Sequence, residues 1–274
     1  MNWPVFFTRL GSAIVFAALM MFGLLGHLWT HSVFGIFGLA LLVQFLGIRE
    51  FYRLSQHIFK EAYFPPYLEW VTQLLGLLVF VGINLASTGG VATAMLSMIP
   101  IILLFVAVLA KRTALTAGMM SLVGLVYVAV PMALLVQLWT INFAIPLALI
   151  LMIWMNDTMA YIVGSFIGRT PFSPISPKKT WEGTIGGALL TIGGAAIWAH
   201  YTSLYHPVDW MALAACAAFA GTAGDLLESK LKRLAGIKDS GNIMPGHGGA
   251  LDRFDSLLAA LPFAFIYIMF AFAP

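Results

Sequence analysis

The chain has little charge and almost no cysteine. Only 9% of its 274 residues are charged and 61% are hydrophobic, and its mean hydropathy of +0.95 lies outside the range of soluble globular domains. The single cysteine, Cys216, excludes an internal disulfide and a cysteine-based metal cluster. No internal repeat, low-complexity tail or soluble domain is recognisable. The composition predicts a protein that crosses a membrane several times.

Long apolar windows predict an all-α polytopic membrane protein with about nine transmembrane helices. A helix needs about 20 residues to cross a hydrocarbon core of about 30 Å. Windows of suitable length lie at residues 10–28, 32–48, 68–86, 91–110, 113–138, 143–167, 183–203, 209–228 and 255–272. We expect the first to be a retained helix and not a cleaved signal peptide. Residues 1–274 should form one membrane domain, with a helical scaffold over about 1–150 and a candidate catalytic region over about 150–274.

The positions of the basic residues predict the orientation of the chain. With a cytoplasmic N-terminus and alternating spans, all 14 Lys and Arg residues fall at cytoplasmic ends and the opposite loops carry none. This asymmetry favours nine spans over eight or ten and places the C-terminus outside the cytoplasm. Topology therefore explains the net charge of +3, and nucleic acid is not an expected partner.

Residues 49–63 mix aromatic side chains with both signs of charge. This mixture is typical of a helix or bent connector at the cytoplasmic interface. Glu50 could instead face a functional site from the end of the second span, but its neighbours in the sequence specify no role.

Asp157 is an acid inside a predicted span. It lies about 15 Å, or ten helical residues, from the cytoplasmic end of window 143–167. An ionised carboxylate is costly in lipid, so Asp157 should face a polar cavity, a cation or a hydrogen-bonding partner. Asn156, Thr158 and Tyr161 add polar groups nearby, and purely structural hydrogen bonding is the alternative.

A short cytoplasmic loop follows at residues 169–182. It is basic, stiffened by three prolines and rich in hydroxyl groups, a combination that suits a polyphosphate. The alternative for its two lysines is a positive-inside anchor. Its candidate substrate-binding residues are Ser176, Lys178, Lys179 and Thr180.

Residues 225–255 concentrate the polar chemistry of the chain. Asp225, Ser229 and Lys232 stand at i, i+4 and i+7, on one face of a helix. Small residues at 245–249 allow backbone amides to approach an anion closely, and Asp252 and Asp255 stand at i and i+3. The other candidates here are Arg233, Lys238, His247, Gly248, Gly249 and Arg253.

Carboxylates that converge beside basic side chains predict a divalent cation. Oxygen-only ligands favour Mg²⁺ or Mn²⁺ over Zn²⁺, and the candidate ligands are Asp225, Asp252 and Asp255. The pattern leaves open whether one or two ions bind. His247 could act as a base or donate a hydrogen bond to a substrate, and a role as metal ligand is less favoured.

Three segments together resemble the phosphatidate cytidylyltransferase family, over about residues 150–260. Met244 and Ala250 replace larger or different apolar residues of the family pattern, and every polar position of the signature is filled. The segments are Asn156-Asp157-Thr158-x-Ala160-Tyr161; Ser176-Pro177-Lys178-Lys179-Thr180-x-Glu182-Gly183; and Ser229-x-Leu231-Lys232-Arg233, four residues, Lys238-Asp239-x-Gly241, then His247-Gly248-Gly249-x-x-Asp252-Arg253-x-Asp255.

The resemblance implies transfer of a cytidylyl group from CTP to phosphatidic acid, which yields CDP-diacylglycerol and pyrophosphate for phospholipid biosynthesis. It places the reaction at the cytoplasmic face of a bacterial inner membrane and suggests a homodimer. Asp225 and Asp252 would hold the metal, Asp157 would line the cavity, and Ser229 would contact substrate. The phosphate clamp would consist of Lys232, Arg233, Lys238 and Arg253.

Two other functions fit parts of the pattern. An ion-coupled transporter could use Asp157 and Asp225 as ion sites, but transport sites usually lie near the midplane of internally repeated chains. A transferase that consumes CDP-diacylglycerol should carry an Asp-Gly-x-x-Ala-Arg pattern, which is absent. A purely structural protein would not keep so many costly charges together.

Overall fold

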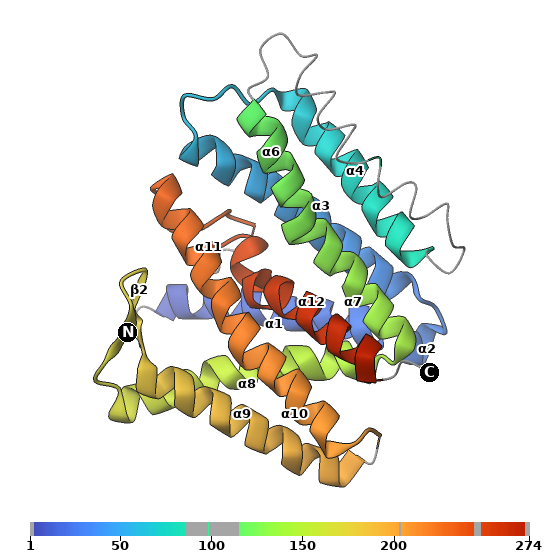
Figure 1. The fold of residues 1–274 in the computed structure, drawn as a ribbon, viewed down its shortest axis with the longest axis vertical. Helices are drawn as coiled ribbons and strands as arrows, with labels where there is room; N and C mark the ends of the chain where they lie inside the picture. Colours follow the sequence, from blue (N-terminus) through green and yellow to red (C-terminus); the bar gives the residue numbers. More distant parts are fainter. Residues whose placement is uncertain (1–2, 86–97, 99–114, 203, 244–247, 272–274) are drawn as a thin grey trace. The chain divides into compact units, whose positions relative to one another are not determined.

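The computed structural model describes residues 3–85, 98, 115–202, 204–243 and 248–271. These residues form helices and one small β-hairpin (Figure 1). The hairpin consists of β1 (Pro171–Ser173) and β2 (Ser176–Thr180). The helices are α1 (Trp3–Leu25), α2 (His27–Thr30), α3 (Phe34–Ile58), α4 (Pro66–Asn84), α6 (Leu115–Gly124), α7 (Val130–Ile141), α8 (Ala144–Ile167), α9 (Trp181–Thr202), α10 (Pro207–Ala215), α11 (Gly221–Ala235) and α12 (Leu251–Ala271).

Six helices of the described residues are long and apolar enough to cross a membrane. They are Phe34–Ile58, Pro66–Asn84, Leu115–Ile141, Ala144–Ile167, Pro207–Ala235 and Leu251–Ala271. Two of them join shorter helices through π-helical turns, Leu125–Ala129 between α6 and α7 and Cys216–Ala220 between α10 and α11. The chain is therefore an α-helical polytopic membrane protein. The predicted windows 10–28 and 183–203 correspond to α1 and α9, while window 91–110 lies outside the described residues apart from Met98.

The chain divides into two compact units. The first comprises Met1–Phe143 with Leu231–Phe254, and the second comprises Ala144–Lys230 with Asp255–Pro274. Both α11 and α12 therefore contribute residues to each unit. The expectation of one membrane domain stays a prediction.

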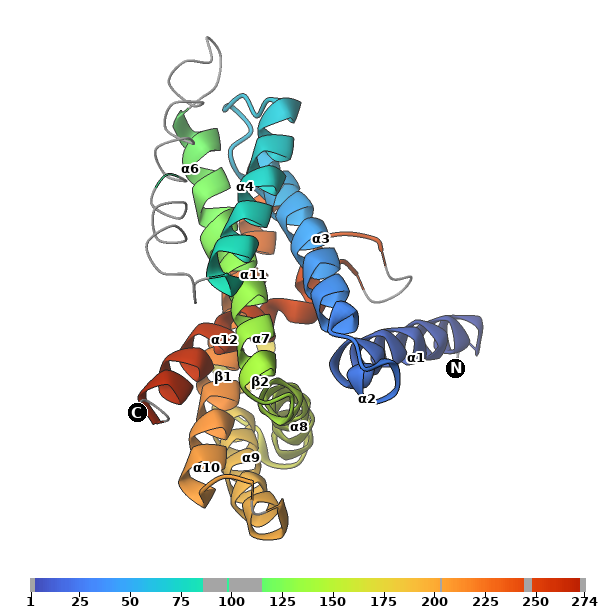
Figure 2. The ribbon, with the colours of Figure 1, turned by 90° about the vertical axis from the view of Figure 1, so that its right-hand side faces the viewer.

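Within the first unit, α3 packs against α1, α4 and the continuous α6–α7 helix (Figure 2). Small residues allow these helices to approach closely: a Cβ on Gly47 would lie 2.8 Å from Val128 Cγ1, and one on Gly124 would lie 2.9 Å from Phe51 Cδ1. α3 continues to Ile58, because the residues after the predicted span keep burying one helical face. Two thirds of the expected interfacial segment 49–63, residues 49–58, thus form the end of a long packed helix.

Within the second unit, α8 and α9 lie side by side and are connected through the hairpin (Figure 1). A Cβ on Gly183 would lie 3.0 Å from Gly164 Cα, and one on Gly187 would lie 2.8 Å from Ala160 Cβ. Only residues without a side chain permit this separation. These glycines therefore serve the packing of α8 against α9.

Candidate functional site

The Asp252 carboxylate is held by four hydrogen-bond donors in the first unit. Lys232 Nζ lies 2.6 Å from Oδ1, while Oδ2 accepts from the Ser240 amide at 2.8 Å, the Ser240 hydroxyl at 2.9 Å and the Gly249 amide at 2.8 Å. The side chain of Asp252 is only 5% exposed. A carboxylate with this many donors is fixed in one position before any ligand arrives.

The glycines before Asp252 are required by the close approach of carboxylates. Gly248 has φ +84°, a conformation that side chains disfavour, and a Cβ there would collide with Asp252 Oδ2. A Cβ on Gly249 or Gly241 would collide with the carboxylate of Glu50. In this structure, the amides of Gly249, Ala250 and Leu251 bind the chain's own carboxylates, and a substrate role for Gly248 and Gly249 stays a prediction.

Glu50 is the residue at this site whose role the sequence did not specify. It lies on α3 and is 2% exposed. Its oxygens accept hydrogen bonds from the Ala250 amide at 2.9 Å and the Leu251 amide at 2.8 Å. The Ser240 hydroxyl lies 2.8 Å from Glu50 Oε2 and 2.9 Å from Asp252 Oδ2, and the two carboxylates share its one proton. The Ser240 hydroxyl therefore lies between Glu50 and Asp252. The sequence signal for a role of Glu50 is an acid on the otherwise buried face of α3. Its partners cannot be identified from the sequence, because they are 190 to 201 residues away.

A second polar cluster lies in the second unit. Lys179 on β2 forms an ion pair with Asp225 on α11, and both side chains are 28% exposed. Asp157 on α8 interacts electrostatically with both of them. Next to it, the Asn156 side-chain amide lies 3.4 Å from the Thr222 hydroxyl. The cation near Asp157 is thus Lys179, and the role expected of Asp157 at the site stays a prediction.

The loop expected at residues 169–182 contains the β-hairpin, a detail that the sequence did not predict. β1 and β2 are antiparallel, with Pro171 opposite Thr180 and Ser173 opposite Ser176. Lys178 is exposed, whereas Thr180 accepts a hydrogen bond from the Gly183 amide at 3.1 Å. Thr180 therefore caps the start of α9 in this structure.

Glu182 fixes the other side of this hairpin. Its carboxylate accepts hydrogen bonds from the amides of Arg169 at 3.2 Å and Thr170 at 3.1 Å. Hydrogen bonds from its own backbone amide, from Thr170 and from Arg169 lower the pKa of Glu182 from 4.5 to about 2. The carboxylate thus stays ionised and holds the ends of the hairpin together near neutral pH.

The remaining candidates are distributed as follows. Arg233, Lys238 and Arg253 are exposed, whereas Ser176, Ser229 and Asp255 are half-buried. His247 lies outside the described residues.

The carboxylates of the two clusters are oxygen ligands, the type that Mg²⁺ prefers. Among the described residues, no three His, Cys, Asp or Glu side chains are grouped so that they could hold a metal ion by themselves. Mg²⁺ usually binds one or two carboxylates together with water and substrate phosphates. Among the contacts of the described residues, Lys232 is the donor to Asp252 Oδ1, and a carboxylate oxygen has about two lone pairs.

The sequence identifies the class of protein to which this fold and these clusters belong. The model of the Cytidylyltransferase family matches residues 8–271. Because the match extends over almost the whole chain, the chain belongs to this family.

Individual relatives carry more specific names. Phosphatidate cytidylyltransferase 4, chloroplastic, of Arabidopsis thaliana is 42% identical over 131 residues, which cover 47% of this chain and 34% of the relative. Phosphatidate cytidylyltransferase of Bacillus subtilis is 44% identical over 116 residues, or 41% of this chain and 42% of the relative. That of Haemophilus influenzae is 41% identical over 120 residues, or 42% of this chain and 41% of the relative. The matched segment thus spans about two fifths or less of each relative's length.

Proposed function

We propose that this protein transfers a cytidylyl group from CTP to phosphatidic acid and forms CDP-diacylglycerol and pyrophosphate. One observation carries the proposal: the Asp252 carboxylate is held in a fixed position. Its Oδ2 accepts from the amides of Ser240 and Gly249, and Lys232 Nζ lies 2.6 Å from its Oδ1. Family membership and relatives that are named phosphatidate cytidylyltransferases support it. The polar clusters lie in a chain of membrane-spanning helices, where a lipid substrate is at hand.

The reaction needs positioning and charge neutralisation and does not need a protein nucleophile. An oxygen of the phosphatidate phosphate attacks the α-phosphorus of CTP, the bond from that phosphorus to the bridging oxygen breaks, and pyrophosphate leaves with the bond electrons. The acceptor phosphate is already an anion. The protein must therefore align two anions and offset their repulsion.

We assign three acidic residues as ligands of a Mg²⁺ or Mn²⁺ ion: Asp225, Asp252 and Asp255. A bound cation would neutralise phosphate charge and stabilise the departing pyrophosphate. Four hydrogen bonds keep the Asp252 carboxylate from rotating. Its preset orientation avoids a loss of side-chain freedom when a ligand binds.

Basic and hydroxyl side chains would bind the phosphates. Arginine and lysine donate charge-assisted hydrogen bonds to phosphate oxygens. Asp157 would line the nucleotide site beside Lys179. The residues assigned to substrate are Ser176, Lys178, Lys179, Thr180, Ser229, Lys232, Arg233, Lys238, His247, Gly248, Gly249 and Arg253.

The proposal includes the orientation of the chain. Nine spans with a cytoplasmic N-terminus would place the basic loops at the cytoplasmic face, where CTP is available. We assign the protein to a bacterial inner membrane, and a homodimer is the expected assembly.

The test is conversion of CTP and phosphatidate by the full chain purified in detergent, with and without Mg²⁺. Replacing the Asp252 carboxylate by an amide (Asp252→Asn) should lower kcat at least about a hundredfold, a loss typical of a removed electrostatic contact. EDTA should abolish the product, and Mg²⁺ should restore it. Glu61 is an exposed carboxylate outside both clusters, and Glu61→Gln should keep full activity.

Two results would contradict the proposal. One is a folded wild-type protein that makes no CDP-diacylglycerol when lipid and detergent are varied; ion flux into vesicles would then be measured. The other is an Asp252→Asn variant as active as Glu61→Gln.

A further inference from the structure

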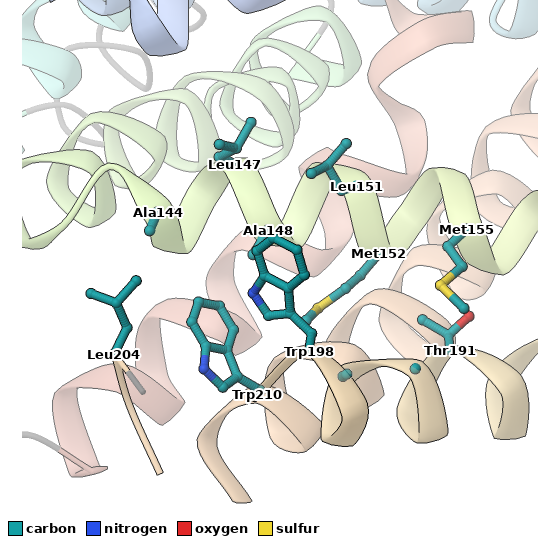
Figure 3. Close-up of a pocket in the computed structure, with 12 residues that line it drawn as sticks. Ala144, Leu147, Ala148, Leu151, Met152, Met155, Thr191, Trp198, Leu204 and Trp210 are labelled. Carbon is teal, nitrogen blue, oxygen red and sulfur yellow. The ribbon is translucent and has the colours of Figure 1, made fainter. Parts of the chain in front are cut away.

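Two buried features lie outside the residues assigned to the reaction. One is an apolar cavity of about 240 Å³ in the second unit, lined mainly by α8, α9 and α10 (Figure 3). Met155 lines it from the side of α8 opposite to Asp157, so the cavity is separate from the polar cluster on that helix. The other feature is the hydroxyl of Ser240 in the first unit, which contacts both Glu50 and Asp252.

Ser240 is enclosed between these two acids. It is 7% exposed, and its hydroxyl oxygen lies 2.8 Å from Glu50 Oε2 and 2.9 Å from Asp252 Oδ2. The two contacts place the carboxylates within about 6 Å of each other, a range in which like charges oppose each other at a buried site. The hydroxyl has one proton to donate. This shared proton therefore both holds the two acids and offsets their repulsion.

The two acids are fixed by different groups on their other sides. Glu50 accepts hydrogen bonds from two backbone amides at the start of α12, at 2.9 and 2.8 Å. Asp252 Oδ2 accepts from the Ser240 amide at 2.8 Å, and Lys232 Nζ lies 2.6 Å from Oδ1. Glu50 is thus anchored to the backbone. The contacts to Asp252 Oδ2 turn its Oδ1 toward a charged partner.

Loss of the Ser240 hydroxyl should disturb this orientation. In Ser240→Ala, the oxygens of Glu50 and Asp252 would face each other without a donor between them. The amides of Ser240 and Gly249 would still hold Asp252 Oδ2, so the carboxylate should stay at the site without its exact orientation. The expected defect is therefore weaker binding of a cation at Oδ1, with the fold retained.

We propose that Ser240 is a positioning residue, which holds Asp252 in the orientation that binds the divalent cation, and that Glu50 acts on Asp252 through it. The inference rests on the proposed function, in which Asp252 is a ligand of Mg²⁺ or Mn²⁺. Removing a group that orients a metal ligand typically costs about 10- to 100-fold in metal affinity. The role of Ser240 is thus measurable as cation affinity.

Ser55 provides a matched control for Ser240→Ala. It is a buried serine of the same unit, 2% exposed, whose hydroxyl donates to the Phe51 carbonyl at 2.9 Å within α3. Mn²⁺ binding to the full chain in detergent, without nucleotide, is measured from the electron paramagnetic resonance signal of free Mn²⁺. Ser240→Ala should raise the Kd for Mn²⁺ about tenfold or more, and Ser55→Ala should leave it unchanged.

Turnover gives a second readout of the same effect. The Mg²⁺ concentration for half-maximal activity should rise about tenfold in Ser240→Ala, while kcat at saturating Mg²⁺ should fall less. Ser240→Thr keeps the hydroxyl and should recover most of the affinity for both ions. All variants are compared at a temperature at which their melting curves show them folded.

A double-mutant cycle tests whether Glu50 acts through Ser240. Ser240→Ala is introduced into the wild type and into Glu50→Gln, which removes one of the two opposed charges. Because the serine proton is shared between the acids, the loss of Mn²⁺ affinity should be at least about threefold smaller in the Glu50→Gln background. Equal losses in the two backgrounds would show that Glu50 does not act through Ser240.

The outcomes separate this inference from the proposed function. Mn²⁺ binding that depends on Ser240, in a chain that makes no CDP-diacylglycerol, would refute the proposed reaction and keep the positioning role. An active chain in which Ser240→Ala binds Mn²⁺ and responds to Mg²⁺ like Ser55→Ala would overturn the positioning role. A wild-type chain that binds no Mn²⁺, or a Ser240→Thr variant as weak as Ser240→Ala, would overturn it as well.

Discussion

At the scale of single residues, the first cluster depends on a buried acid that no local pattern explains. Glu50 connects α3 to the loop before α12 through two backbone amides and the Ser240 hydroxyl. Ser240 in turn contacts Asp252. The position of Asp252 is therefore fixed in part by a residue about 200 positions earlier in the chain.

Replacing Glu50 should reduce both stability and catalysis. Glu50→Ala leaves buried donors without acceptors, and each orphaned donor costs about 1–3 kcal/mol. We expect a lower melting temperature in detergent and, through misplacement of Asp252, a fall in kcat of about 10- to 100-fold at temperatures where the variant is folded. Glu50→Gln keeps the shape of the side chain and one carbonyl acceptor. Its melting temperature and kcat should therefore lie between those of Glu50→Ala and the wild type.

Exposed Glu61 supplies the control for this experiment. Glu61→Ala should change neither melting temperature nor kcat. If Glu50→Ala lowers the melting temperature but keeps wild-type kcat when folded, Glu50 stabilises the fold without positioning Asp252.

At the scale of elements, the hairpin is the structure that the sequence did not predict. Residues 169–182 predicted a stiff basic loop, and the structure forms β1 and β2 with Glu182 and Thr180 capping the transition into α9. Short strands with several prolines have no clear periodicity. The caps therefore became visible only with the backbone in place.

The hairpin gives a prediction for pH dependence. The folded-state pKa of Glu182, about 2, lies below its ordinary value of 4.5, so its ionised form stabilises the folded state. This contribution is complete above pH 4.5 and is lost as pH falls through 2. Glu182→Gln should therefore have a lower melting temperature than wild type from pH 5 to 7, and the difference should shrink below pH 4.5.

Melting temperatures of both proteins from pH 3 to 7 check this prediction. Glu61→Gln should follow the wild type throughout. A difference between wild type and Glu182→Gln that stays constant down to pH 3 would show that the charge of Glu182 does not stabilise the hairpin.

At the scale of the whole molecule, the distribution of basic residues predicts which loops share a side of the membrane. Because Cys216 is the single cysteine, a Cys216→Ala chain can carry new cysteines one at a time. Lys60, Lys230 and Tyr201 are exposed. Lys60→Cys and Lys230→Cys should react with a membrane-impermeant maleimide only from the cytoplasmic side, and Tyr201→Cys only from the opposite side.

Labelling of intact cells and of inverted vesicles gives the two arms of this test. Each protein should be labelled in one preparation only. Labelling of Tyr201→Cys and Lys60→Cys in the same preparation would contradict the nine-span arrangement, since an odd number of crossings must separate them.

The sequence by itself determined the membrane class, the approximate position of the described spans and the polar residues of the signature. These follow from local properties: an apolar window long enough for a bilayer is a helix wherever it lies, and a signature is a matter of residue order. The tertiary structure decided which donors hold each carboxylate. Glu50 with Ser240 and Leu251, and Lys179 with Asp225, are contacts between distant segments. The packing of whole helices creates them, and no periodicity in the sequence encodes that packing.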